Sequence, residues 1–453
     1  YKKTMIRDFF SSLKEDKYKR HIVLAFFLFA VFIFVSTQFY LASVNVSSRF
    51  ATMKALVEHQ TFAIDDYHSV TNDKIFRQEH YYSSKPPVLS LAGAGIYYVL
   101  HNFFAFDLQM KFSEVDMSVY IITIILSGLS YLWILFLFYK IFQLLNIKKK
   151  YQSWLLLGFG LGTLYLPYAT TLNNHTIAGA FLLASFYYLL KLKLKVLKNY
   201  KKGLFLMGLF ASIAAVLDLP TGLLFLVLFF IYIFFNFPKR QLYFYILGAI
   251  PFLALHLFLN YQIVGTFLPP QFLPEYWDGN NNVINFLGGK KQIITKVAFN
   301  TRKNPLFYII NILIGTHGLF SYSPILIFSC YGFWKVFKNK SSFRKEAIIV
   351  LFAFLSLLAF YTFKISIYTG TAFGFRWLIA ITPLLYIFLI NIFSQPIKIS
   401  FKISFLIVLF FSTIISIVGL INPWSNFVLL ELSDSSAKTL EFPFLANLIM
   451  LLK

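Results

Sequence analysis

Hydrophobic residues along the chain gather into runs of roughly 20, each long enough as a helix to cross the roughly 30 Å of hydrocarbon in a bilayer. The alternation of polar and apolar positions that marks a membrane β-barrel is not apparent, so helices have to satisfy the backbone hydrogen bonds. The sequence therefore predicts an all-α, polytopic membrane protein with about 11 transmembrane helices. We expect them near residues 21–44, 117–145, 152–172, 175–197, 203–219, 221–237, 241–262, 307–335 (broken near 315–323), 346–363, 377–396 and 401–422.

The apolar segment 86–104 does not fit this series of spans. Counting it as a crossing would place the basic block 148–150 outside and would invert the orientation of every later basic block. We therefore predict an interfacial or re-entrant helix at 86–104. The helical spacing of apolar residues over 48–59 predicts another helix that lies along the membrane surface.

Lysine and arginine indicate the orientation of the chain. Most of them fall in loops that lie on one side of the predicted spans, and the positive-inside rule makes that side cytoplasmic. The predicted organisation is a cytoplasmic N-terminal segment 1–20, a multi-pass membrane domain 21–422 with outer loops 45–116 and 263–306, and an outer C-terminal tail 423–453.

Composition agrees with a membrane protein, since 58% of the 453 residues are hydrophobic and only 13% are charged. In a soluble protein the net charge of +23 would suggest nucleic acid, but here the lysines lie in short blocks between apolar runs. These blocks suit membrane lipids, and no nucleic-acid partner is expected. Cys330 is the only cysteine, which excludes an intrachain disulfide and a thiolate metal cluster.

Carboxylates are distributed unevenly across this topology. Apart from Asp8, Glu15, Asp16 and Glu346, all the acidic residues fall outside. Acidic residues orient helices only weakly, so their clustering on one face indicates function there. The alternative is that long outer loops simply collect charge.

The first outer loop supplies the candidate catalytic residues, Asp65 and Asp73. General base catalysis needs a carboxylate in a partly desolvated cleft. Asp65 has the apolar and aromatic neighbours expected of a residue that faces protein, whereas Asp73, next to Lys74, also suits a structural cap. The histidines of this loop, including the candidate substrate-binding residue His80, together with its carboxylates permit a divalent metal, although no tight ligand spacing appears.

Other candidate substrate-binding residues lie at predicted outer helix ends. Two prolines follow Lys85 and fix an ammonium group at head-group depth, where it suits a lipid phosphate. Arg376, in TAFGFRW, suits an anionic head group through its planar fork. Snorkelling to the interface is the alternative for both cations. The remaining candidates, for which a structural role at a helix end or a break is the alternative, are His175, Asp218 and His317.

These features resemble the GT-C superfamily of membrane glycosyltransferases, and in particular relatives of the protein O-mannosyltransferases and aminoarabinose transferases. The residues that carry the resemblance are the outer loop with its Asp, the Lys-Pro-Pro phrase, LDLPTG at 217–222, THGLFSYSP at 316–324 and GFRW at 374–377. Relatives often carry an Asp-Glu pair before an Arg-aromatic pair, but Arg49–Phe50 follows Val46–Ser47–Ser48 here. The catalytic carboxylate must then come from further along the loop, from Asp65 or Asp73, or be lost.

The resemblance implies an inverting transfer of a sugar from a polyprenyl-phosphate donor, outside a prokaryotic plasma membrane. A loop carboxylate would act as base, while Lys85 and Arg376 would neutralise the departing phosphate. No cofactor follows for certain, and the sequence gives neither the sugar nor the acceptor. Two alternatives remain, a lipid or solute transporter (including a flippase) and an inactive relative that binds lipid-linked sugar.

Overall fold

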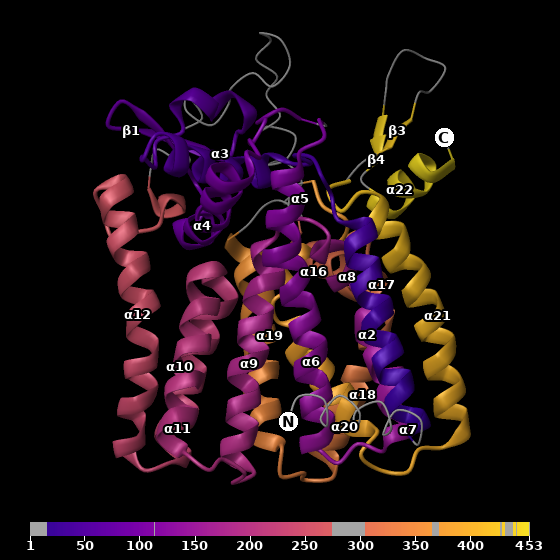
Figure 1. Ribbon diagram of the computed structural model, residues 1–453. Coiled ribbons are helices and arrows are strands. Elements are labelled where there is room, and N and C mark those ends of the chain that lie inside the picture. The colour runs from indigo at the N-terminus through magenta and orange to yellow at the C-terminus, as the bar shows by residue number, and fades with distance from the viewer. Residues whose placement is uncertain are drawn as a thin grey trace, which may run out of the picture.

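The computed structural model describes residues 16–112, 114–273, 304–364, 371–425, 428–430, 438–440 and 442–452. Long helices stand side by side in one bundle, and short helices and a β-hairpin cover one end of it (Figure 1). Within the described residues, nine helices are long and apolar enough to cross a membrane. The predicted all-α, polytopic membrane fold is confirmed, and the chain is an integral multi-pass membrane protein.

Every predicted span contains helix. The helices of the bundle are α2 (Lys17–Ser36), α5 (Met117–Thr123), α6 (Leu129–Leu144), α7 (Lys149–Gly160), α8 (Tyr165–Ala169), α9 (Asn174–Lys193), α10 (Tyr200–Leu217), α11 (Leu224–Asn236), α12 (Lys239–Val264), α16 (Pro305–Ile314), α17 (Leu319–Tyr322), α18 (Ile327–Lys338), α19 (Arg344–Lys364), α20 (Thr382–Ile392) and α21 (Ile399–Ile421). Short π- and 3-10-helical turns join some of them, at Ile124–Gly128, Leu219–Leu223, Pro324–Leu326 and, as η6, Arg376–Leu378.

Two spans are interrupted. The predicted span at 307–335 breaks between α16 and α17, as expected from its glycines. The predicted span at 152–172 divides into α7 and α8, and Pro167 in α8 has no backbone N–H to continue a helical ladder. The ends of such broken helices place polar groups inside protein, which a continuous helix does not.

Residues of the predicted first outer loop, called here the first outer segment, cover one end of the bundle, which is called the outer end after its predicted side. The segment contains α3 (Val44–Glu58), the 3-10 helix η1 (Asp65–Val70), strands β1 (Lys74–Arg77) and β2 (His80–Ser83), and α4 (Pro87–Phe104). In Figure 1, α4 lies with α3 above α10. It is not among the nine membrane-spanning candidates, which agrees with the predicted shallow helix at 86–104.

The β-hairpin in this segment was not predicted. Strands β1 and β2 pair antiparallel, with Lys74 opposite Ser83 and Arg77 opposite His80. Strands of four residues are too short to show a clear alternation of polar and apolar positions. A second short hairpin, β3 (Val428–Leu430) with β4 (Lys438–Leu440), and α22 (Pro443–Leu452) lie at the same end of the bundle (Figure 1).

Helix α9 is the most buried of the spans and packs against α6, α10 and α20. Its first residues reach the outer end of the bundle, where the first outer segment covers them. The start of α9 is therefore buried beneath that segment, where Asn174 contacts Arg49 of α3.

Candidate functional site

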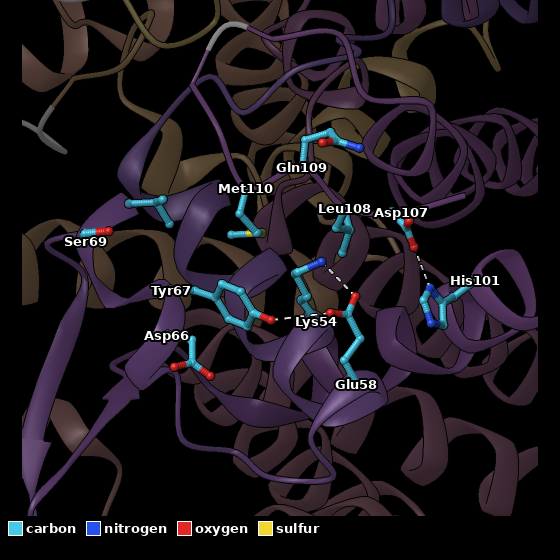
Figure 2. Close-up of a pocket in the computed structure, with 11 residues that line it drawn as sticks. Lys54, Glu58, Asp66, Tyr67, Ser69, His101, Asp107, Leu108, Gln109 and Met110 are labelled. Carbon is cyan, nitrogen blue, oxygen red and sulfur yellow. Dashed lines mark hydrogen bonds and ion pairs between the residues drawn. The ribbon is translucent and has the colours of Figure 1, made fainter. Parts of the chain in front are cut away.

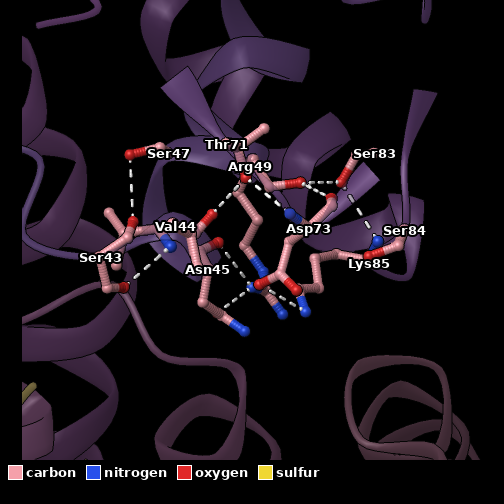
Figure 3. Close-up of polar contacts among 12 residues, drawn as sticks. Ser43, Val44, Asn45, Ser47, Arg49, Thr71, Asp73, Ser83, Ser84 and Lys85 are labelled. Carbon is pink, nitrogen blue, oxygen red and sulfur yellow. Dashed lines mark hydrogen bonds and ion pairs between the residues drawn. The ribbon is translucent and has the colours of Figure 1, made fainter. Parts of the chain in front are cut away.

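A salt bridge between the hairpin and the start of α4 forms the centre of the candidate site. Lys85 Nζ lies 2.8 Å from Asp73 Oδ2, and only 14% and 22% of these side chains are exposed. The backbone around the pair is fixed, because the Asp73 carbonyl accepts hydrogen bonds from Ser84 N at 3.0 Å and from Ser48 Oγ at 2.6 Å. In Figure 3 the side chains of Arg49, Asp73 and Lys85 point toward one another.

Arg49 contributes a second, fully buried cation from α3. Its guanidinium donates to the Asn45 carbonyl at 3.2 Å and to the Asn45 side chain, and to Asn174 Oδ1 at 2.9 Å. Asn174 lies in the first turn of α9, so Arg49 joins the outer segment to the bundle. The Nε atom of Arg49 has no hydrogen-bond partner among the described residues. A buried donor without a partner in a native protein suggests a ligand or water that accepts from it.

Arg376, in η6, is the third cation of this cluster. Burial raises the pKa of the Asp73 carboxyl, but the cations of Lys85, Arg376 and Arg49 outweigh burial and hold that pKa below its usual value. Burial lowers the pKa of Lys85; Asp73 opposes this shift, while Arg49 and Arg376 add to it. Residues far apart in the sequence therefore bring their charges together around Asp73.

A buried histidine–carboxylate pair adjoins the cations. His175 Nδ1 lies 2.8 Å from Asp218 Oδ2, and both residues are buried where α9 starts and α10 ends. The neighbouring Asn174 donates from Nδ2 to the Leu217 carbonyl at 3.0 Å, which ties the same two helix ends together. The cluster thus contains three cations, Arg49, Lys85 and Arg376, and two carboxylates, Asp73 and Asp218.

The structure thus brings together five of the residues singled out in the sequence: Asp73, Lys85, His175, Asp218 and Arg376. Two others, His80 and Asp65, pair with each other, with His80 Nδ1 2.6 Å from Asp65 Oδ2. His80 lies at the turn end of the hairpin, away from the end that Asp73 and Lys85 flank. His317 is fully buried at the break between α16 and α17, where its Nδ1 lies 3.2 Å from Thr316 Oγ1.

The expectation that Asp65 faces protein more than Asp73 does is wrong. The Asp65 side chain is 41% exposed, against 22% for Asp73. The apolar neighbour Ile64 is buried, but η1 begins directly after it and turns Asp65 toward the Tyr81 N–H, which donates to Oδ1 at 2.7 Å. Apolar neighbours in sequence therefore did not indicate where this side chain points.

Sequence reasoning did not assign the amides around Arg49 to the site. Arg49 served only as a landmark of the family pattern, and Asn45 and Asn174 were not singled out. Asn45 and Arg49 are four residues apart, a spacing that makes residues neighbours on a helix surface, but the predicted helix began only at residue 48 and left Asn45 out. The pairing with Asn174 spans 125 positions, and no local pattern predicts it.

A separate cavity of about 590 Å³ opens beside the C-terminal end of α3 (Figure 2). Its charged groups are mostly acidic, since three carboxylates and one lysine line it with one histidine. The lining residues are Lys54, Glu58, Asp66, Tyr67, Ser69, Val70, His101, Asp107, Leu108, Gln109 and Met110. An anionic cavity and a cationic cluster thus occupy different parts of the same outer segment.

Two crystal structures of ArnT from Cupriavidus metallidurans are similar to this chain. The structure bound to undecaprenyl phosphate matches with a TM-score of 0.55 at 13% sequence identity. The apo structure matches with a TM-score of 0.51 at 12% identity. Both matches cover 85% of this chain and 62% of the ArnT chain, so this chain spans less than two thirds of ArnT. No family model and no curated protein matches the sequence.

At 13% and 12% sequence identity, this similarity shows a shared fold alone. The chain has the membrane fold of the ArnT structures, and the fold expected from the sequence resemblance is confirmed. One of the ArnT structures shows that ArnT binds undecaprenyl phosphate.

Proposed function

We propose that this protein is a membrane glycosyltransferase that moves a sugar from a polyprenyl-phosphate donor to an acceptor on the non-cytoplasmic face, with inversion. The observation that carries the proposal is the group of three cations, Arg49, Lys85 and Arg376, around Asp73. In this proposal the cations bind the donor phosphate, and Asp73 accepts the proton of the acceptor hydroxyl. The shared fold with ArnT, which binds a lipid phosphate of this kind, adds support.

The cations suit a phosphate because the cluster carries more positive than negative charge. A buried cation without an adequate counter-charge is costly, and an anionic ligand removes that cost. Arg49 still has a donor to offer at Nε. Charge-assisted hydrogen bonds contribute about 1.5–3 kcal/mol each, so two or three of them bind a phosphate firmly. The same cations would stabilise the charge that develops as the phosphate departs.

Asp73 is the carboxylate placed to act as base. In the proposed reaction the bond between the sugar C1 and the phosphate oxygen breaks, and a bond from C1 to the acceptor oxygen forms on the opposite face. The acceptor proton passes to Asp73. When Lys85 turns from Asp73 to the donor phosphate, the pKa of Asp73 rises from its depressed value, which makes Asp73 a better base.

Membrane lipids and the lipid-linked donor are the proposed partners, and a prokaryotic plasma membrane is the proposed location. The cluster lies at the end of the bundle opposite to the basic block 148–150, where α7 starts (Figure 1). A basic block is typical of the cytoplasmic side, which supports a position of the cluster at the outer head-group level. A donor phosphate anchored by its lipid tail would meet the cations at that level.

A binding experiment with a matched control tests the phosphate site. Purified protein in lipid nanodiscs is titrated with undecaprenyl phosphate, and Lys85→Met is compared with Lys54→Met. Both lysines pair with a carboxylate at 2.8 Å and have side chains that are 14% exposed, but Lys54 lies in the anionic cavity. Loss of one charge-assisted bond of about 1.5–3 kcal/mol predicts roughly 10- to 100-fold weaker binding for Lys85→Met alone.

Equal affinities of the two variants would contradict the assignment of the phosphate to Lys85. A transporter is distinguished by a second measurement on the same protein. A flippase moves intact lipid phosphate across a vesicle membrane, whereas a transferase in the presence of donor and acceptor releases undecaprenyl phosphate without its sugar. Transport of the intact lipid with no release of sugar would exclude the proposed reaction.

A further inference from the structure

The anionic cavity beside α3 contains three side chains that converge from separate parts of the chain. Glu58 is the last residue of α3, His101 lies in the last turn of α4, and Asp107 lies in the loop that follows α4. Each offers one nitrogen or oxygen atom, and these atoms all lie within 4.8 Å of one another. Figure 2 shows the three side chains on one side of the cavity.

Neighbouring residues hold this group in place. The Tyr97 hydroxyl donates to Glu58 Oε1 at 2.5 Å and accepts from the Leu108 N–H at 3.1 Å, so it joins α3, α4 and the loop after α4. His101 Nδ1 lies 2.7 Å from Asp107 Oδ1. His101 and Asp107 are therefore already adjacent, and Tyr97 is a neighbour of the kind that orients metal ligands in proteins.

We propose that Glu58, His101 and Asp107 bind a divalent metal ion, and that Zn²⁺ is preferred over Mg²⁺ and Ca²⁺. Carboxylate oxygens and imidazole nitrogens are both Zn²⁺ ligands, whereas Mg²⁺ and Ca²⁺ select oxygen alone. Three protein ligands leave one coordination position for water, which the open cavity supplies. The ion would tie together α3, α4 and the loop that leads to α5. This proposal does not depend on the proposed glycosyltransferase activity.

Lys54 gives the proposal a distinctive signature. Its ammonium lies 2.8 Å from Glu58 Oε1 and supplies positive charge to the carboxylate when metal is not bound. An incoming ion has to displace this ammonium, which also lies 5.6 Å from the centre of the Tyr67 ring and can turn toward that face. Removing Lys54 should therefore increase metal affinity, while removing a ligand should decrease it.

The test measures metal affinity directly on the full chain, purified with a histidine-free tag and stripped with chelator. Zn²⁺, Mg²⁺ and Ca²⁺ are titrated against a chromophoric competitor. We expect Glu58→Gln, His101→Asn and Asp107→Asn to weaken Zn²⁺ binding by at least about tenfold, since even residues that only orient a ligand contribute this much. Lys54→Met should strengthen binding, and Zn²⁺ should raise the thermal midpoint of the wild type but not of His101→Asn.

Asp66→Asn is the matched control, because Asp66 lines the same cavity but does not belong to the converging group. Its affinity for Zn²⁺ should equal that of the wild type. If Asp66→Asn loses as much affinity as His101→Asn, binding reflects general negative charge and the site is refuted. Absence of Zn²⁺ binding, or weaker binding in a folded Lys54→Met protein, would also overturn the proposal.

Discussion

Asp73 and Asp65 are both carboxylates of the first outer segment, but their surroundings assign them different roles. Asp73 lies among three cations, whereas Asp65 pairs with the exposed His80 and a hairpin N–H. If Asp73 is the base, Asp73→Asn should reduce sugar transfer by about 100- to 10,000-fold. Asp65→Asn should retain most of the activity. Release of undecaprenyl phosphate from a sugar-loaded donor, followed in wild-type and variant membranes, measures both.

The opposite ranking would return the catalytic role to Asp65. Binding of undecaprenyl phosphate by Asp73→Asn serves as the control for folding, because removal of a carboxylate from a cationic cluster should not weaken binding of an anion. A variant that neither binds nor transfers has lost the structure of the site. Its result then says nothing against Asp73 as base, so Asp73→Ser is measured as a second variant in the same way.

The sequence predicted which charged side chain lies next to a proline that starts a helix, but it did not predict the direction in which a loop side chain points. Two prolines marked Lys85 as a cation fixed at a helix start, and the structure places it there. Asp65 was ranked first because of its apolar neighbours, but the 3-10 turn that begins at this residue directs it outward. The hydrogen bond of Arg49 to Asn174 depends on how two distant helices dock. Such contacts follow from tertiary packing, which a single sequence does not encode locally.

At the scale of elements, the predicted spans reflect one strong physical constraint. In hydrocarbon every backbone N–H and C=O needs a hydrogen-bond partner within the protein. Long apolar runs therefore form helices regardless of the segments that flank them. This constraint weakens at the outer end, where water and protein both satisfy the backbone. There the shallow helix α4 was predicted from charge balance, whereas the hairpin of β1 and β2 went unpredicted.

Helices α10 and α12 approach each other so closely that their contact requires glycine. A Cβ on Gly208 would lie 2.0 Å from the Tyr245 carbonyl oxygen, and one on Gly248 would lie 2.0 Å from the Phe205 carbonyl oxygen. Small residues allow such close backbone packing between membrane helices. Gly208→Ala and Gly248→Ala should each destabilise the protein by about 1–3 kcal/mol, the usual cost of overpacking. The thermal midpoint in detergent measures the loss.

Gly95→Ala is the control for this contact. Gly95 lies within α4, and a Cβ there would meet nothing within 4 Å. Alanine is the better helix former by about 0.5–1 kcal/mol, so this variant should be as stable as the wild type or slightly more stable. If Gly208→Ala were equally harmless, the two helices would have room to separate and the close contact would not matter for stability.

At the scale of the whole molecule, both candidate sites lie at one end of the bundle. The cationic cluster, the anionic cavity and helix α4 belong to this end, and the basic block 148–150 at the start of α7 lies at the other (Figure 1). The chain must then cross the membrane an odd number of times between the loop that follows α4 and the basic block 148–150. The proposed chemistry depends on it, because a lipid phosphate and an outward acceptor have to meet at the same face.

Cysteine labelling tests this arrangement. Cys330, the only cysteine, is exposed on α18 and is first replaced in Cys330→Ser. Lys111→Cys and Lys149→Cys then form a matched pair, since both are exposed lysines (64% and 68% of the side chain) that pair with an acidic residue. In intact cells a membrane-impermeant maleimide should label position 111, and position 149 should react only after the membrane is opened.

The two positions flank α5 and α6, so their labelling reports the number of crossings between them. Opposite sides require one crossing, as the continuous helix over Met117–Leu144 provides. Labelling of both positions from outside would mean that the basic block before α7 is not cytoplasmic. The cluster around Asp73 would then lose its assigned side, and an outward donor site would be untenable even if the protein bound a lipid phosphate. Labelling of position 149 alone from outside would mean that the protein has the opposite orientation, with the cluster on the cytoplasmic face.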